Sequence, residues 1–172
     1  HDPGAVNLDV VRLERATSVS DALDIAPQCG IPAQNMLVVD RSGHIAWTLA
    51  GRLPERTGFD GRRPASWADG TRRWTGWLDA ASYPRQVDPA TDCLWTANQR
   101  CVGGTALALI GDAGFGLGAR GRQIRDALLE MHAARPVDLL QLQLDDRALF
   151  LARWRDLLLE SLTPEAVRAD PR

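Results

Sequence analysis

The segment at residues 35–51, NMLVVDRSGHIAWTLAG, limits the possible folds more than any other part of this sequence. An apolar run leads into a polar turn that ends in Gly43, and Ile45, Trp47 and Leu49 then alternate with smaller residues. A period of two places alternate side chains on one face of a strand, and a short turn containing glycine joins antiparallel neighbours. The pattern therefore predicts a β-hairpin with one buried face.

The residues on either side of this hairpin predict a short helix and an irregular segment. Residues 17–29, TSVSDALDIAPQC, begin with hydroxyl side chains that cap helices and stop before Gly30 and Pro32, so they predict a short helix. Residues 52–89 are rich in Gly, Pro, Arg and Trp and follow no sustained period, which predicts an ordered irregular segment or a series of short strands. We expect the four tryptophans from position 47 to position 77 to be shielded from solvent: Trp47, Trp67, Trp74 and Trp77.

The second half of the chain predicts one strand, one loop and two helices. Residues 93–96 continue as a strand, and seven glycines in residues 102–121 predict a tightly turned or flexible loop. The helices are expected at residues 122–134 and 138–162, with an interruption of the second at Asp145 and Asp146.

Length and chain ends give an expectation about domain organisation. A chain of 172 residues is about the size of one domain, so we expect residues 1–172 to form a single unit. The sequence has no initiator Met, and residues 163–166, TPEA, have the cap, proline and acid that start a helix, yet the sequence ends six residues after them. We therefore expect a part of a longer protein, truncated at both ends.

Charge and composition exclude several classes of protein. The net charge is −2, from 20 basic and 22 acidic residues, which argues against nucleic acid or an anionic membrane as a partner. All basic residues are arginine, so a Schiff-base lysine, a lysine general base and a P-loop are excluded. The longest apolar runs, such as residues 106–110, are far shorter than the ~20 residues of a membrane span.

Sequence motifs for a cofactor or metal are weak. GLGARG at residues 116–121 has the G-x-G-x-x-G spacing, but GDAGF separates it from the apolar run before it, and no second strand ending in an acid follows. A glycine-rich turn is the better interpretation. His1, His44 and His132 are scattered and do not form a metal-binding pattern. We predict neither a cofactor nor a metal site in this stretch.

The three cysteines, Cys29, Cys93 and Cys101, form no C-x-x-C motif. Cys93 and Cys101 bracket a short segment, which leaves two interpretations: a disulfide that closes a hairpin in an oxidising compartment, or small buried side chains.

Two adjacent side-chain amides stand out between these cysteines. The segment CLWTANQRCVGG, residues 93–104, brings Asn98 and Gln99 to the end of the predicted strand, and Arg100 follows directly. An asparagine at such a place either satisfies backbone groups or serves a catalytic site, and composition alone does not choose between the two.

Several segments in order resemble the β chain of the penicillin acylase (penicillin amidase) family of N-terminal-nucleophile hydrolases. They are NMLVVDRSGHIAWTLAGRLPERTGFDGRRP, WTGWLDAASYPRQVDPATDCLWTANQR, GARGRQIRDALLE and LLQLQLDDRALFLARWRDLLLESL, which together cover most of residues 35–162. The resemblance implies an α/β (α+β) fold, as a fragment of an αββα sandwich. It also implies an amide hydrolase made by self-cleavage, in which an N-terminal Ser attacks the acyl carbonyl and its own α-amine is the base.

In that family an Asn of the TANN-like motif donates its side-chain amide to the oxyanion, and Asn98 matches this position. An Arg at the start of the GARGRQI-like helix supports the nucleophile's network. The best match is Arg120, with Arg122 as the alternative if the register shifts. Two departures are visible: Gln99 stands where many relatives have a second Asn, and the loop at residues 102–117 is richer in glycine.

The resemblance also implies the context of the site. The substrate is an acyl amide, either a β-lactam side-chain amide, an acyl-homoserine lactone or another compound of this class. The partners are the α chain and the rest of the β chain, the location is periplasmic or secreted, and a structural calcium belongs to the complete enzyme. Gly61 and Asp112 align too loosely to be assigned as its ligands. Because no N-terminal Ser, Thr or Cys is present, we expect these residues alone to be inactive.

The alternative is a binding module without catalytic activity. In that case the Trp-rich segment at residues 67–77 forms an interaction surface, and Asn98 only satisfies backbone groups.

Overall fold

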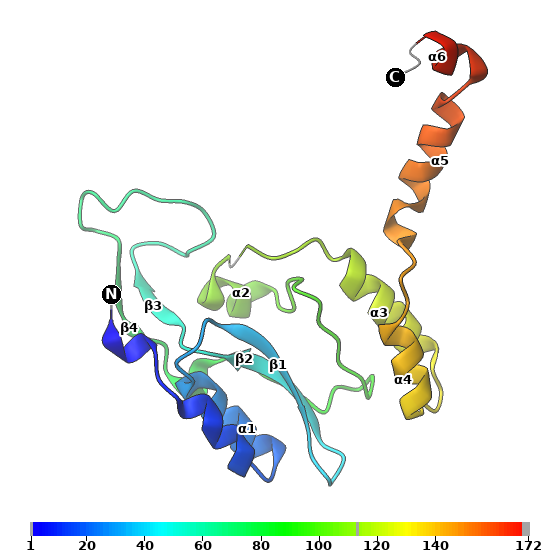
Figure 1. Cartoon of the computed structure of the whole chain (residues 1–172). Coiled ribbons are helices and arrows are strands. Elements are labelled where there is room, and N and C mark those ends of the chain that lie inside the picture. The colour runs from blue at the N-terminus through cyan, green and yellow to red at the C-terminus, as the bar shows by residue number, and fades with distance from the viewer. Residues whose placement is uncertain (1, 113, 170–172) are drawn as a thin grey trace. The chain divides into compact units, whose positions relative to one another are not determined.

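The computed structural model describes residues 2–112 and 114–169, and the chain divides into two compact units, His1–Gly121 and Arg122–Arg172 (Figure 1). Each unit is described by itself. The expectation that residues 1–172 form a single unit stays a prediction.

The predicted hairpin forms the centre of the first unit. Strand β1 (Gln34–Val39) pairs antiparallel with β2 (Ile45–Ala50), in a register that places Gln34 opposite Ala50 and Val39 opposite Ile45. The side chain of Asp40 closes the turn by accepting hydrogen bonds from two backbone N–H groups, and Gly43 adopts a φ of +89° there. The short strand β5 (Gln86–Val87) pairs with the other edge of β2, so β2 is the central strand.

The helix predicted before the hairpin is also confirmed. Helix α1 (Val19–Ile25) begins with a capping box, in which the side chain of Ser18 accepts from the backbone of Asp21 and the carboxylate of Asp21 accepts from the backbone of Ser18. Its buried residues Val19 and Leu23 pack against Ala46 of β2. Among the described residues of the first unit, four 3-10 helices accompany these elements: η1 (Pro3–Ala5), η2 (Asp9–Arg15), η3 (Ala26–Gln28) and η4 (Ala80–Ser82).

The segment between the hairpin and the amide motif contains short strands, one of the two predicted forms. Strand β3 (Pro54–Thr57) pairs antiparallel with β4 (Arg73–Trp77), with an irregular register between Glu55 and Arg56. The prediction that all four tryptophans are shielded is wrong. Trp47 is only 3% exposed, whereas Trp67 in the long β3–β4 connection is 43% exposed and Trp74 in β4 is 59% exposed. The connection lies away from the central sheet (Figure 1).

The predicted strand at residues 93–96 does not form. Asp88 and Asp92 adopt left-handed φ values of +43° and +51°, which turn the chain twice just before this segment. Residues 93–96 therefore run as irregular chain without a ladder partner, and Asn98 lies in a bend rather than at a strand end.

The predicted glycine-rich loop at residues 102–121 contains an unpredicted helix, α2 (Gly104–Ile110). Its apolar residues Leu107 and Ile110 are buried against Leu53 and Tyr83. Apolar burial on one face thus outweighs the poor helix propensity of the surrounding glycines.

The remaining helices are α3 (Ala119–Glu130), α4 (Pro136–Gln143), η5 (Leu149–Leu151), α5 (Ala152–Ser161) and α6 (Pro164–Ala169). Helix α3 starts three residues before its predicted position. The expected interruption at Asp145 and Asp146 is confirmed, because α4 and α5 are separate. In the part of the chain that the structure describes, no helix combines the length and apolarity needed to cross a bilayer.

Candidate active site

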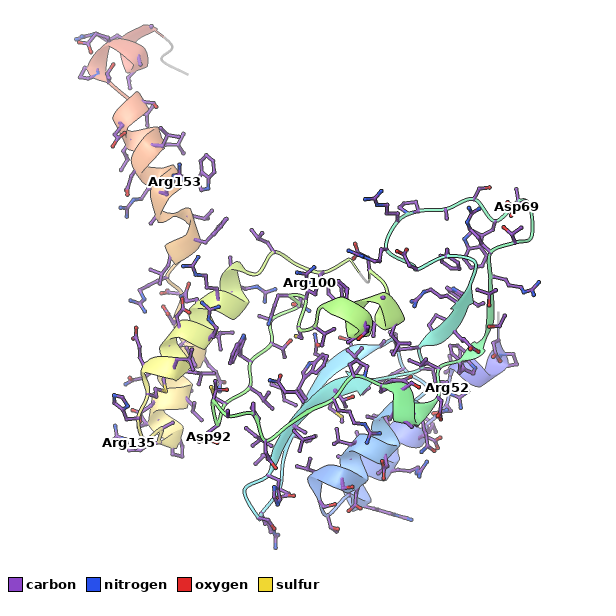
Figure 2. All side chains as sticks on the ribbon, turned by 180° about the vertical axis from the view of Figure 1, so that it is seen from behind. Arg52, Asp69, Asp92, Arg100, Arg135 and Arg153 are labelled. Carbon is purple, nitrogen blue, oxygen red and sulfur yellow. The ribbon has the colours of Figure 1, made fainter. Side chains whose placement is uncertain are left out.

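Asn98 lies in a bend, and the loop that follows α2 forms a hydrogen bond with the backbone of this bend. Its φ is +65°, a left-handed conformation that Asn adopts more readily than most residues. The carbonyl oxygen of Asn98 accepts a hydrogen bond from the backbone N–H of Gly116 at 2.7 Å. The side chain remains exposed, and Arg100, labelled in Figure 2, follows two residues later. The main chain of the motif is thus fixed while its side-chain amide faces outward.

Arg120, the second residue of α3, fixes the orientation of that amide. Its Nη2 donates to Oδ1 of Asn98 at 2.9 Å, across 22 residues of sequence. A guanidinium has only donors, so the amide must present its oxygen to Arg120 and direct its NH2 group elsewhere. Among the described residues, none accepts a hydrogen bond from Nδ2 of Asn98. The site therefore presents a neutral, oriented donor with free hydrogens.

Gln99 plays a different part from its neighbour. Its Oε1 accepts the backbone N–H of Ala97 at 2.5 Å, so the side chain folds back over the bend. Its Nε2 lies 3.8 Å from Sγ of Cys101, and that sulfur lies 3.6 Å from Oδ1 of Asn35 in β1. These contacts connect the amide motif to the hairpin. Sequence reasoning treated Gln99 only as a departure from the family pattern, because the contact with Ala97 depends on the shape of the bend.

Of the two arginines considered from the sequence, Arg120 contacts Asn98. Arg122 pairs with Asp126, one helical turn further along α3, at 3.5 Å. The structure thus brings together Asn98 and Arg120, the two residues that the resemblance singled out, and their roles stay predictions.

Arg56 holds the start of the loop that reaches Asn98. Its guanidinium donates to the carbonyl oxygens of Leu109 and Ile110, at 2.9 and 2.8 Å, where α2 ends. Burial lowers the pKa of Arg56 from its ordinary value. A half-buried cation at the last carbonyls of a helix is favoured by the helix dipole, and these two hydrogen bonds connect β3 to the end of α2.

The described residues do not offer a metal site. They contain no group of three His, Cys, Asp or Glu side chains that could hold an ion. Asp60 and Asp112 line a common hollow of about 370 Å³, but three arginines line it too: Arg62, Arg63 and Arg100. Because three guanidinium charges repel a metal cation, the residues that line this hollow do not by themselves fit calcium. A calcium in the complete enzyme stays a prediction.

The cysteines are free in the structure, so Cys93 and Cys101 do not form the disulfide that was one of the two interpretations. Sγ of Cys101 lies near Asn35, Thr96 and Gln99 instead.

A family model described as penicillin amidase matches residues 1–171. The chain belongs to the penicillin amidase family. The resemblance on which the sequence analysis relied is therefore confirmed, and with it membership of a family of amide hydrolases.

Two curated relatives illustrate this membership. The chain is similar to acyl-homoserine lactone acylase QuiP of Pseudomonas fluorescens, with 36% identity over 90 residues, which are 52% of this chain and 11% of that protein. It is also similar to the penicillin acylase 2 proenzyme of Pseudomonas sp., with 29% identity over 93 residues, 54% of this chain and 12% of that protein. The match spans about a tenth of the length of these penicillin amidase relatives.

A solved structure confirms the predicted fold class. The thermostable penicillin G acylase from Alcaligenes faecalis superposes with a TM-score of 0.62 at 18% sequence identity. The match covers 78% of this chain and 24% of that one, so the chain adopts a portion of the penicillin amidase fold.

Proposed function

We propose that these residues form part of an amide hydrolase that cleaves an acyl amide through an acyl-enzyme, with Nδ2 of Asn98 as an oxyanion donor. The observation that carries the proposal is the 2.9 Å contact between Arg120 and Oδ1 of Asn98. It leaves the NH2 group free and restricts its direction. Membership of the penicillin amidase family supports the same reaction class.

The chemistry explains why a neutral amide suits this position. When a nucleophile adds to an acyl carbonyl, negative charge develops on the carbonyl oxygen, and a donor that is already oriented stabilises it without reorganisation. The positive charge of Arg120 behind the amide polarises it further toward donation. Being uncharged, the amide leaves the pKa of a nearby attacking amine almost unchanged.

We propose that the nucleophile and its base come from other segments of the same enzyme, as an N-terminal Ser whose α-amine accepts the hydroxyl proton. An α-amine with a pKa near ~8 can do this close to neutral pH. The relatives named above act on penicillins or acyl-homoserine lactones by their names, which supports an acyl amide as substrate. A periplasmic or secreted location and assembly with an α chain and the rest of a β chain belong to the same proposal.

Replacement of Asn98 by Ala in the complete gene product tests this role. We expect kcat for acyl transfer to fall about 10²- to 10³-fold, about 3 to 4 kcal/mol in barrier, with a small change in KM. Gln141→Ala removes an exposed amide from α4 and serves as the matched control. Unchanged acylation by the Asn98 variant would remove the assignment. The 172-residue chain alone is expected to show no saturable amide hydrolysis.

The aromatic side chains of the β3–β4 region favour a second candidate, a binding module. Phe59, Trp67 and Trp74 stack edge to face, with ring centroids 5.1 and 5.8 Å apart, and two of the rings are exposed. Iodide quenching of tryptophan emission in the complete protein, compared with a Trp67→Phe, Trp74→Phe variant, distinguishes the candidates. If iodide quenches these tryptophans, a binding surface is supported. If it does not, the rings contact other segments of the enzyme.

A further inference from the structure

We infer that Gln99 and Gly121 form a size-matched contact that positions Asn98. Gln99 is a positioning residue in this inference, and Gly121 is the residue that leaves room for it. The inference deepens the proposed function and rests on it, because it explains how the oxyanion donor is held.

The first half of the contact is the folded-back side chain of Gln99. Its Oε1 accepts the N–H of Ala97 at 2.5 Å, so residues 97–99 close into a tight bend with Asn98 at its centre. A half-buried backbone N–H needs such a partner, and this one fixes the path of the chain on both sides of Asn98. The left-handed φ of +65° at Asn98 is the conformation that the bend requires.

The second half is the absence of a side chain at Gly121. A Cβ at this buried position would lie 2.6 Å from Cδ, 2.7 Å from Oε1 and 2.9 Å from Nε2 of Gln99. Real Cβ atoms do not approach other heavy atoms this closely, so the Gln99 amide fills the space that a methyl group would occupy. A methyl group here would make this flexible side chain rotate away and give up its hydrogen bond with the N–H of Ala97. Glycine is a poor helix residue, and this contact gives a physical reason for its place in the first turn of α3.

Two consecutive residues of α3 thus contact two consecutive amides. Arg120 orients the side chain of Asn98, and Gly121 accommodates the side chain of Gln99. On the other side, Gln99 reaches Cys101, whose Sγ lies 3.6 Å from Oδ1 of Asn35.

Asn35 in turn is held by a buried tryptophan. Oδ1 of Asn35 accepts the indole N–H of Trp47 at 2.9 Å, and Trp47 lies on the central strand β2. The bend is therefore held between a helix and the sheet, and displacement of Gln99 would move Asn98 away from Arg120.

Three variants of the complete gene product test the contact: Gly121→Ala, Gln99→Asn and the double variant. We expect Gly121→Ala to lower kcat at least 10-fold with KM within 2-fold, because the donor is misplaced while substrate contacts remain. Gln99→Asn shortens the side chain by one methylene and should lower kcat about 3-fold. The double variant should match Gln99→Asn alone, because the methyl group then has no amide to displace, and such non-additivity marks a direct contact.

Gly118→Ala is the matched control, since a Cβ at Gly118 meets nothing within 4 Å. Its kcat should stay within 2-fold of the unmodified enzyme. The inference is wrong if Gly121→Ala has the same kcat as Gly118→Ala. It is also wrong if the fold-loss of kcat in the double variant equals the product of the fold-losses in the two single variants.

A second measurement keeps this test separate from that of the proposed function. In the complete gene product without substrate, hydrogen exchange of the Ala97 amide reports the contact without any catalysis. We expect protection of this amide to fall at least 10-fold in Gly121→Ala and to be unchanged in Gly118→Ala. Unchanged protection in Gly121→Ala would overturn the contact even if Asn98 proves essential. If Gly121→Ala loses this protection while Asn98→Ala leaves acylation unchanged, the contact is supported and the proposed function is contradicted.

Discussion

The guanidinium of Arg120 contacts Asn98 through one nitrogen, Nη2, which lies 2.9 Å from Oδ1. A lysine at this position would keep the charge but not the planar geometry of the guanidinium, and its flexible ammonium would hold the amide less firmly. We therefore expect Arg120→Lys in the complete gene product to lower kcat about 10-fold, or about 1.4 kcal/mol in barrier, with little change in KM. Steady-state kinetics measure this loss of kcat, and Arg153→Lys on α5 is the control. Activity equal to the unmodified enzyme would show that orientation by Arg120 is unimportant.

The pair formed by His44 and Asp88 gives the hairpin a dependence on pH. Nδ1 of His44 lies 2.8 Å from Oδ2 of Asp88, and this hydrogen bond, together with the charges of Asp88 and Asp40, raises the pKa of His44 above 6.5. The backbone N–H of Ile45 and the side chain of His44 lower the pKa of Asp88. Because the histidine pKa is raised on folding, its stabilisation is complete below pH 6.5 and is lost as pH rises through the folded value.

We therefore expect His44→Gln to destabilise the chain more at pH 5.5 than at pH 8.5. Urea unfolding of both forms at the two pH values measures the difference, and equal effects at both would contradict the role of the pair. Below about pH 4 the contribution of Asp88 is lost as well, since its pKa is lowered on folding.

Tyr83 holds the short connection between β2 and β3 through one buried hydroxyl. Its Oη accepts the N–H of Leu53 at 2.8 Å and donates to the carbonyl of Gly51 at 2.9 Å, and burial raises the pKa of the phenol. Tyr83→Phe leaves a buried N–H unpaired, so we expect a loss of about 1 to 3 kcal/mol in the free energy of unfolding. Chemical denaturation checks this, with no change expected in the slope against denaturant. A loss below 0.5 kcal/mol, on the order of a surface substitution, would contradict the expectation.

Among the elements, α1 depends most clearly on local sequence. Its capping box satisfies two backbone donors at the first turn, through Ser18 and Asp21. We expect Ser18→Ala to reduce the free energy of unfolding by about 1 kcal/mol, whereas Ser42→Ala in the hairpin turn, whose contact uses only its backbone, should change it little. Thermal unfolding of the two variants side by side provides the comparison, and equal midpoints would count against the cap.

The elements that the sequence predicts well are those determined by neighbouring residues. The alternation at residues 45–49 and the cap at Ser18 lie within one element each, so the hairpin and α1 are found correctly. The strand expected at residues 93–96 fails because the turns at Asp88 and Asp92 depend on positive φ values that no apolar pattern reveals.

For the candidate site too, one part could be expected from the sequence and another could not. The resemblance pointed to Asn98 and Arg120, and the structure places these two residues in contact. The contact of Gln99 with Gly121 joins residues that are distant in sequence and depends on the missing Cβ, so periodicity and composition contain no signal for it.

At the scale of the whole molecule, the two units differ in how much apolar surface they bury. The buried apolar residues all lie between Val19 and Ile110, and among the described residues of the second unit none is buried, while α5 exposes Leu157, Leu158 and Leu159. Isolated helices of this length are marginal in water. We expect hydrogen exchange of the 172-residue chain to show at least 10³-fold protection in β2 and less than 10-fold protection in α5. Comparable protection in both elements would contradict this difference.

The close approach of Gln99 and Gly121 also restricts how this part of the protein can evolve. A methyl group at position 121 is incompatible with the folded-back conformation of Gln99, so the order in which the two positions change affects the site. A lineage that first shortens the side chain at 99, as in Gln99→Asn, can then accept alanine at 121 without displacing a side-chain amide. The opposite order passes through an intermediate with a displaced Asn98, which selection for activity would remove. Related sequences should therefore combine glutamine at 99 with glycine at 121, and should admit larger residues at 121 only beside a shorter side chain at 99.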